Sequence, residues 1–211
     1  MEKNWSYKIP DGPHAGKVLW SGRYCAVAAF VFRCKDGQWS VLANLRGPGT
    51  PDYQGCWNTV CGFLEANEDA KQGCSREIFE ETGYAIDPET FLQVNTQTDP
   101  ETSNNGNVTL RHIAIIFDDE DLLADDPKGG EEDEVSQVAW IPIIDIHDFN
   151  WAFNHEEVID DLYYNFIYPL NKYSDITTGE YFMLAHPEWL NDNPKVKDII
   201  KDKLLFQFGL Q

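Results

Sequence analysis

The chain has 211 residues, enough to bury a substantial core, and its apolar and charged fractions of 42% and 25% are ordinary for a globular domain. Its net charge of −20 argues against general binding of nucleic acids or of anionic membrane surfaces, because like charges repel at long range. Small phosphate compounds stay compatible with this charge, since a bound divalent cation can reverse the local sign.

The sequence predicts neither a membrane span nor an oxidised protein. No apolar run approaches the roughly 20 residues that cross a bilayer, and the first residues lack the apolar segment of a signal peptide. Five cysteines without any CxxC spacing favour reduced thiols in a cytoplasmic protein. The alternative is a zinc site from Cys56, Cys61 and Cys74 with a distant histidine, although this spacing matches no standard zinc pattern.

The first part of the chain predicts a leader followed by strands. Residues 1–22, rich in Gly, Pro and aromatic residues, predict an irregular or weakly paired leader. The apolar run RYCAVAAFVFRC (23–34) predicts a buried strand, and KDG followed by QWSVLANLR (38–46) predicts its return in a hairpin. A Gly- and Pro-containing loop follows, and then WNTVCGFLE (57–65) predicts another short strand.

A helix is predicted over residues 68–82, with Asn67 as its N-cap, acidic residues in its first turn and Gly83 as its end. Further strands are predicted at about 90–98, 107–117 and 135–143, the last after an acidic loop over 118–134. The spacing of apolar residues over 154–170 predicts a helix that packs on the core.

These elements together predict an α/β sandwich. We divide the chain into the leader 1–22, one domain over 23–170, and a C-terminal extension over 171–211. The extension contains enough apolar residues to pack on the domain or on a second subunit, and a short helix is predicted after Pro194.

The predicted helix over 68–82 places Glu77, Glu80 and Glu81 on one face. At about 100° per residue the three carboxylates lie within about 100° of arc, where they repel one another. A hard divalent cation such as Mg²⁺ takes oxygen ligands and would remove the repulsion; the alternative is an ordinary solvated acidic face. Gly73, one turn before Glu77, is expected to leave room for a ligand.

The stretch GFLEANEDAKQGCSREIFEETGY (62–84) fits the pattern G-x5-E-x7-R-E-U-x-E-E-x-G-U at every fixed position, U being a bulky apolar residue. The matching residues are Gly62, Glu68, Arg76, Glu77, Ile78, Glu80, Glu81, Gly83 and Tyr84. The stretch resembles the Nudix box, the signature of the Nudix hydrolase family. The resemblance is specific over 57–84, is supported in outline from 23 to about 170, and reaches neither the leader nor the extension.

The resemblance implies a Nudix-type α/β/α sandwich with a mixed central sheet and a metal-dependent pyrophosphohydrolase. It implies that Glu77, Glu80 and Glu81 bind Mg²⁺ or Mn²⁺ together with the backbone carbonyl near Gly62. The family's arginine, here Arg76, usually pairs with the glutamate at position 68. Water would attack a phosphorus of the pyrophosphate while a carboxylate accepts its proton.

The resemblance leaves the general base open. Glu80 is one candidate, and the family often takes the base from a later loop, where this chain has Glu131, Glu132 and Glu134. Solvated loop acids are the alternative interpretation of those three residues. The predicted catalytic residues are therefore the following: Arg76, Glu80, Glu81 and Glu132.

Arg46, Gly62 and Phe63 are the predicted substrate-binding residues. Arg46 ends a strand, where its cation could reach a phosphate, and Phe63 could stack on a base, as could Trp57 and Tyr53. Core packing is the alternative for these aromatic residues. His112 lies next to Arg111 inside a strand pattern, and a histidine hydrogen-bonded within the sheet is favoured there over a catalytic one.

The favoured substrate is a nucleoside diphosphate linked to another moiety, ADP-ribose or a nucleotide sugar, because similar ADP-ribose pyrophosphatases often carry a proline soon after the box, where Pro100 stands. Nucleoside triphosphates, dinucleoside polyphosphates, a nucleotide sensor without activity, and an interaction protein with an accidental box are the alternatives. No basic helix-turn-helix pattern is visible in 171–211, so neither nucleic acid nor membrane is an expected partner, while a homodimer is compatible with the family.

Overall fold

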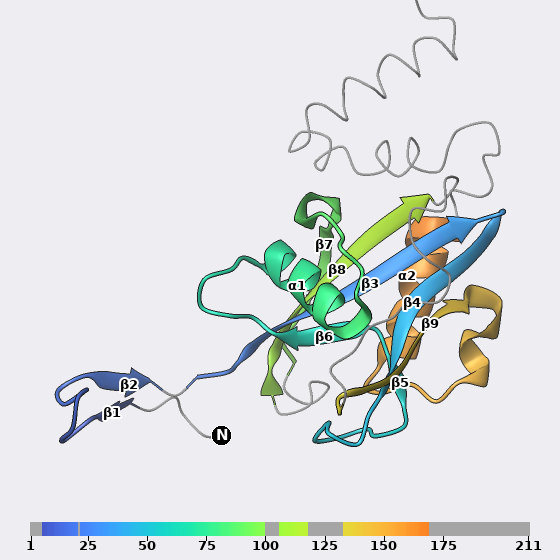
Figure 1. Cartoon of the computed structure of the whole chain (residues 1–211). Coiled ribbons are helices and arrows are strands. Elements are labelled where there is room, and N and C mark those ends of the chain that lie inside the picture. The colour runs from blue at the N-terminus through green and yellow to red at the C-terminus, as the bar shows by residue number, and fades with distance from the viewer. Residues whose placement is uncertain (1–5, 21, 100–105, 118–132, 169–211) are drawn as a thin grey trace, which may run out of the picture.

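The computed structural model describes residues 6–20, 22–99, 106–117 and 133–168. Its main feature is a seven-stranded sheet with a helix on each face (Figure 1). The strands are β1 Ser6–Lys8, β2 Val18–Trp20, β3 Cys25–Lys35, β4 Gln38–Arg46, β5 Trp57–Asn58, β6 Val60–Phe63, β7 Leu92–Gln97, β8 Val108–Phe117 and β9 Val135–Pro142. The helices are α1 Ala70–Thr82 and α2 His155–Leu162, with 3-10 helices at Pro88–Thr90 and Ile143–Asp148 and a π-helix at Tyr163–Ile167.

The predicted hairpin at the start of the domain is confirmed. Strands β3 and β4 pair antiparallel from Phe32 opposite Val41 to Lys35 opposite Gln38. The two residues between them, Asp36 and Gly37, both have positive φ angles, of 50° and 76°. This is the two-residue turn whose twist suits a hairpin, and Asp and Gly are the residue types that tolerate it.

The sheet forks beside its central strand. One edge of β3 pairs in parallel with β8 along its whole length, and β7 pairs antiparallel with β8 beyond it. The other edge of β3 is shared, because β6 pairs with residues 26–29 and β4 with residues 32–35. Farther along the chain, that side of β4 pairs with β5 at Asn44 and Leu45, while β9 pairs with the opposite edge of β4 from Ser40 to Arg46, so β4 diverges from β6.

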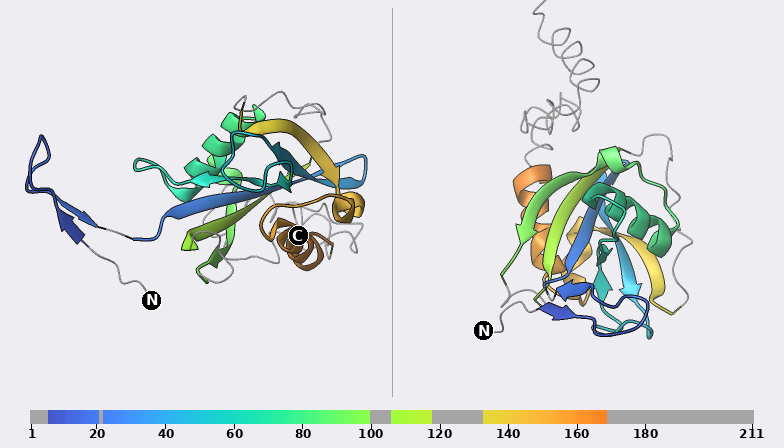
Figure 2. Two further views of the ribbon diagram at one scale, coloured as in Figure 1. Left: turned by 90° about the horizontal axis from the view of Figure 1, so that it is seen from below. Right: turned by 90° about the vertical axis from the view of Figure 1, so that its left-hand side faces the viewer.

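Alternate residues of β3 face two separate hydrophobic layers. Ala28, Phe30 and Phe32 pack in one layer with Val158 and Ile159 of α2. Val27, Ala29 and Val31 pack in the other with Cys74 and Ile78 of α1. Because side chains alternate across a strand, one apolar run fills both cores, and two further views show the helices on opposite sides (Figure 2). The predicted α/β/α sandwich with a mixed sheet is confirmed.

Helix α1 begins two residues later than predicted. Asp69, not Asn67, is the N-cap: its carboxylate accepts hydrogen bonds from the backbone N–H groups of Lys71 and Gln72. The Gln72 side chain in turn accepts from the Asp69 N–H at 2.9 Å, which completes a capping box. The first turn contains no acidic residue, so that prediction was also wrong. Gly83 ends the helix as predicted, with φ 76°.

Replacing Gly83 by Ala should lower the free energy of unfolding by about 1–2 kcal/mol, because an L-residue pays a steric penalty in the left-handed region. Urea denaturation of the two proteins measures the change. Gly22→Ala is the matched control, since Gly22 has no positive φ and no atom within 4 Å of an added Cβ. Equal losses in both variants would contradict the assignment.

The two ends of the described chain differ in detail from the predicted elements. Strands β1 and β2 form a separate two-stranded sheet in the leader, in agreement with a weakly paired leader. Helix α2 stops at Leu162, followed by the π-helical turn, whereas the sequence predicted one helix over 154–170. Residues 118–132 and 171–211, with the predictions made on them, lie outside the described ranges. Within those ranges no helix is both long and apolar enough to cross a membrane.

Candidate active site

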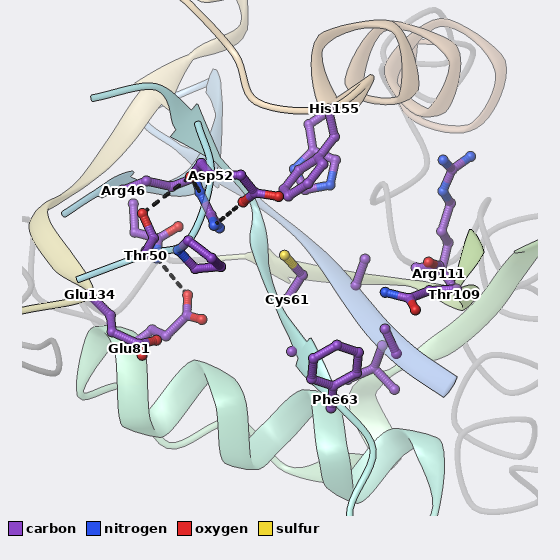
Figure 3. A pocket seen from close by; sticks show the side chains of 18 of the residues that line it. Arg46, Thr50, Asp52, Cys61, Phe63, Glu81, Thr109, Arg111, Glu134 and His155 are labelled. Carbon is purple, nitrogen blue, oxygen red and sulfur yellow. Dashed lines mark hydrogen bonds and ion pairs between the residues drawn. The ribbon is translucent and has the colours of Figure 1, made fainter. Parts of the chain in front are cut away.

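A cavity of about 380 Å³ lies at the fork of the sheet (Figure 3). Its wall is built from β3, β4, β6 and β8, from the last turn of α1, and from the residues that lead into α2. Glu81 and Arg46 lie toward one end, with Asn44 hydrogen-bonded to Glu81, and Thr109 and Arg111 lie toward the other. The cavity therefore brings together segments that are far apart in the sequence.

Arg76 is the centre of an ion cluster between α1 and the segment formed by β6 and the loop that follows it. Its Nε and Nη2 bind the two carboxylate oxygens of Glu68 at 2.9 and 2.7 Å. Its Nη1 lies 2.9 Å from Glu77 and 2.7 Å from Glu80, and Nη2 donates to the carbonyl of Phe63 at 3.0 Å. The hydrogen bonds from Arg76 lower the pKa of Glu68. One guanidinium thus binds both the segment before α1, through Phe63 and Glu68, and two carboxylates of the helix.

Two glycines allow this cluster to form. A Cβ added to Gly62 would lie 2.1 to 2.4 Å from the carboxylate atoms of Glu77, so this carboxylate rests directly on the backbone of β6. A Cβ added to Gly73 would lie 3.0 Å from Leu64 and 3.1 Å from Glu68. The space at Gly73 is therefore filled by the loop, and the prediction that it admits a ligand was wrong.

Glu81 lies on the cavity side of α1. Its Oε2 accepts a hydrogen bond of 2.5 Å from Asn44 Nδ2 of β4. Burial raises the pKa of Glu81 well above its ordinary value, and the negative charge of Glu77 raises it further, while Arg46 and Asn44 oppose the shift. Burial likewise raises the pKa of Glu77. The positive charges of Arg76 and Arg46 therefore only partly offset the effect of burial on the pKa values of Glu77 and Glu81.

The donor set at α1 fits a hard divalent cation. Glu77, Glu80 and Glu81 offer carboxylate oxygens on α1, and Glu77 lies against the backbone of Gly62. Burial raises the pKa values of Glu77 and Glu81, and the charges of neighbouring glutamates add to both shifts, so a cation would favour the ionised forms. Asn44 Oδ1, beside Glu81, is buried without a hydrogen-bond partner. Among the described residues no three His, Cys, Asp or Glu side chains already converge on one point, since Arg76 and Asn44 hold these carboxylates.

Arg46 lines the cavity, as its predicted role requires, but it is bound to the loop that follows. Its Nη2 lies 2.7 Å from Asp52 Oδ1 and its Nε donates to the carbonyl of Asp52 at 3.0 Å. The guanidinium also lies 5.2 Å from the centre of the Phe153 ring. Its contact with a substrate phosphate stays a prediction.

Of the acids in the later loop, Glu134 lines the cavity, and its charge contributes to the raised pKa of Glu81. Glu131 and Glu132 lie outside the described ranges, so the catalytic role of Glu132 stays a prediction. Glu80 does not line the cavity and its carboxylate binds Arg76.

The aromatic candidates separate into two groups. Phe63 is 56% exposed, lines the cavity and packs on Tyr24 with ring centres 5.5 Å apart, so it is free to receive a base. Trp57 packs edge-on against Phe149 in the α2 core layer and is not part of the cavity wall, which is the alternative we gave for it. His112 is buried, with its Nδ1 3.2 Å from the carbonyl of Leu110, as predicted for a histidine within the sheet.

The sequence did not predict His155 at the site. Its Nδ1 accepts a hydrogen bond of 3.1 Å from the backbone N–H of Thr59, which interrupts the predicted strand over 57–65 between β5 and β6. Burial lowers the pKa of His155 to about 3, and the charges of Arg111 and Arg46 lower it further. The ring is therefore neutral, with its proton on Nε2. Partners 96 positions apart leave no local signal in the sequence.

The cysteines do not form the zinc site considered above. All five thiols are free. Cys61 belongs to the α2 core layer and Cys74 to the α1 layer, on opposite faces of the sheet. Cys61 lines the cavity, where burial and the charge of Glu81 raise its pKa to about 12, so this thiol stays protonated.

Comparisons with known proteins agree with this architecture. The family model described as NUDIX domain matches residues 23–162. The NUDIX domain of Shewanella oneidensis NrtR, solved with ADP ribose, is 23% identical, with a TM-score of 0.59 over 69% of this chain and 89% of that one. NrtR from the same organism, solved with a 27mer DNA, is 21% identical, with a TM-score of 0.52 over 67% and 61% of the two chains.

A third solved structure is a bifunctional NMN adenylyltransferase/ADP ribose pyrophosphatase from Francisella tularensis, with AMP and a Mn ion. It is 21% identical, with a TM-score of 0.55 over 68% of this chain and 42% of that one. At these identities the likeness establishes the fold alone. A search of curated proteins found no match.

Proposed function

This chain belongs to the NUDIX domain family, and from that premise we propose that it is a metal-dependent hydrolase of a nucleoside diphosphate linked to a second moiety. The observation that carries the proposal is the carboxylate pair Glu77 and Glu81, held against β6 and β4 beside a cavity of about 380 Å³. Nucleotide-sized ligands occupy cavities of about this volume.

Each residue of the site has a role that follows from its contacts. Glu77, Glu80 and Glu81, with the carbonyl near Gly62, would hold Mg²⁺ or Mn²⁺, which would neutralise the diphosphate and lower the pKa of the attacking water. Arg76 positions two of these carboxylates through its ion pairs. Arg46 supplies a cation to the cavity for a phosphate oxygen, and Phe63 supplies an exposed ring for a base.

The positions of the carboxylates limit which residues can act as the general base. A base must lie within hydrogen-bond reach of the water, and among the described candidates Glu81 and Glu134 line the cavity while Glu80 does not. Glu132 stays a proposed catalytic residue of the same loop as Glu134.

ADP-ribose and nucleotide sugars are the substrates we favour. The NrtR NUDIX domain was solved with ADP ribose, and the Francisella protein includes an ADP ribose pyrophosphatase. A single exposed aromatic ring beside the cavity suits one base. Nucleoside triphosphates and dinucleoside polyphosphates are the alternative substrates, and a hydrolysis assay with each class of compound separates them.

A second candidate function is a nucleotide sensor, because NrtR was solved with DNA as well as with ADP ribose. The net charge of −20 opposes DNA binding by this chain, and its box matches the family pattern at every fixed position. We therefore favour the enzyme.

Five free thiols also support a reducing compartment, which we take to be the cytoplasm. We assign the activity to residues 23–170.

Hydrolysis is tested by incubating the full chain and Mg²⁺ with ADP-ribose, nucleotide sugars, dinucleoside polyphosphates and nucleoside triphosphates, followed by a phosphatase that releases countable phosphate. We expect release from at least one diphosphate-linked compound and none in EDTA, because without a cation the carboxylates and the diphosphate repel one another. Tight binding with no turnover across the panel would contradict the enzyme and favour the sensor. A gel-shift assay with DNA then tests the regulator.

A further inference from the structure

The end of the cavity away from Glu81 contains a cation, Arg111, that no carboxylate of the described residues neutralises. Arg111 of β8 is half-buried, and its Nη2 donates a hydrogen bond of 2.9 Å to Asn154 Oδ1, just before α2. Within the described part of the chain it forms no ion pair, whereas Arg46 at the other end binds Asp52 at 2.7 Å. Its remaining N–H groups are available to a ligand.

Among the described residues that line the cavity, no acid lies beside Arg111. The acidic residues of the cavity wall, Asp52, Glu81 and Glu134, lie with Arg46 at the opposite side (Figure 3). Neutral polar residues line the cavity near Arg111, including Thr109 two positions away on the same strand. Burial lowers the pKa of His155, and the charges of Arg111 and Arg46 lower it further, so this neutral ring supplies no negative charge to Arg111.

A guanidinium without an acidic partner among the described residues is unexpected in a chain with a net charge of −20. Burial lowers the pKa of Arg111, so removal from water disfavours its charge, yet an arginine stays protonated in proteins. A half-buried cation without a counterion lowers stability unless a ligand supplies the negative charge. The Asn154 side chain fixes one side of the planar group, which favours a two-pronged contact with an oxyanion from the other.

We propose that Arg111 binds a second oxyanion of the substrate, remote from the pyrophosphate, so that the preferred substrate carries an additional phosphate or carboxylate. This inference rests on the proposed function. It makes Arg111 a specificity residue: the acid end of the cavity handles the bond to be cleaved, and the Arg111 end selects which nucleotide derivative is bound.

The test uses two pairs of compounds that each differ by one anionic group. ADP-ribose and its 2′-phosphate differ by a phosphate, and UDP-glucose and UDP-glucuronate differ by a carboxylate. Dissociation constants are measured by calorimetry with Mg²⁺ in the Glu81→Gln background. This substitution is expected to slow hydrolysis, and the cation offsets the repulsion between the diphosphate and the carboxylates. We expect the charged member of at least one pair to bind about tenfold or more tightly than its partner, as hydrogen bonds between charged groups allow.

Variants separate Arg111 from a general effect of charge. Arg111→Gln should reduce the preference to about one by weakening only the charged compound, and Arg111→Lys should keep part of it, because the charge stays while the planar fork is lost. Lys71→Gln removes the same charge at a residue that binds Glu89 outside the cavity, and should leave the preference unchanged. Thermal melting of each variant confirms that it is folded.

Two results would overturn the inference: equal or undetectable binding of both members in both pairs, or a loss in Arg111→Gln that is the same for charged and neutral compounds. The second result would mean that Arg111 contacts a group common to both. Parallel assays with Mg²⁺ keep the two claims apart. If a binding preference depends on Arg111 but no compound is hydrolysed, the anion site is supported and the proposed enzyme is rejected. If compounds are hydrolysed but no binding preference is found, the enzyme is supported and the anion site is rejected.

Discussion

Replacing Glu81 by Gln is expected to lower kcat/KM for the best pyrophosphate substrate by about 10²- to 10⁴-fold, the range that a proton-transfer or charge-stabilising carboxylate contributes. Glutamine keeps the shape of the side chain and an oxygen toward Asn44 Nδ2, which now lies 2.5 Å from Glu81 Oε2. It removes the negative charge that a divalent cation or an attacking water would use. Steady-state kinetics with Mg²⁺ measures the loss.

The same substitution should leave stability unchanged or raise it. The pKa of Glu81 is raised in the folded state, mainly by burial. A carboxyl group with a raised folded pKa lowers stability as pH increases above its unfolded value of about 4.3, and the neutral Gln removes that loss at pH 7. Thermal melting in EDTA measures it. A large drop in activity without a drop in melting temperature is therefore the signature of a functional carboxylate.

Glu89→Gln is the matched control for Glu81→Gln. Glu89 lies outside the cavity, binds Lys71 at 3.2 Å, and is mostly exposed, so the same chemical change there should alter neither activity nor stability by much. Normal activity in Glu81→Gln would remove Glu81 from the mechanism and with it the proposed metal site on α1.

Replacing Arg76 by Ala is expected to lower the free energy of unfolding by about 2–3 kcal/mol in EDTA. Removing one partner of a fully buried ion pair costs about 3–5 kcal/mol, and the side chain of Arg76, which is 23% exposed, places this cluster somewhat below that range. The loss has two parts: the loop that begins after β6 loses its tie to α1, and Glu68, Glu77 and Glu80 lose their shared cation. Urea denaturation measures it.

The Arg76 variant also tests the metal site. Because a divalent cation and the guanidinium both neutralise the same carboxylates, Mg²⁺ should raise the stability of Arg76→Ala more than that of the wild type. Arg76→Lys should fall between the two, since it keeps the charge without the two-pronged contact to Glu68. Equal stability of Arg76→Ala and wild type in EDTA would show that the ion cluster does not hold the loop.

Local patterns in the sequence predicted the elements that local forces form. The hairpin of β3 and β4 and the end of α1 at Gly83 depend on neighbouring residues, and both are confirmed. The N-terminus of α1 was wrong by two residues because two residue types suited to a cap compete there. Asp69 is the N-cap because Gln72 lies three positions after it and completes the capping box.

The walls of the cavity could not be predicted in this way. The fork depends on which parts of β3 pair with β4 and β6, and the contacts of Asn44 with Glu81 and of Arg111 with Asn154 join residues 37 and 43 positions apart. Of these residues, Arg111 leaves a trace in the sequence, as an arginine within a mostly apolar strand. The box therefore predicts the chemistry, while substrate selection depends on contacts that only the fold creates.

The proposed function requires a divalent cation to bind between the carboxylates of α1 and the backbone of β6. Anomalous diffraction from two crystals tests it. The wild type is crystallised with Mn²⁺ alone, and the Glu81→Gln variant is crystallised with Mn²⁺ and ADP-ribose. We predict a manganese peak next to Glu77 and Glu81 in the wild type that is weakened in the variant. A wild-type protein that hydrolyses its substrate in the same Mn²⁺ buffer, but shows no anomalous peak beside these carboxylates, would contradict the account.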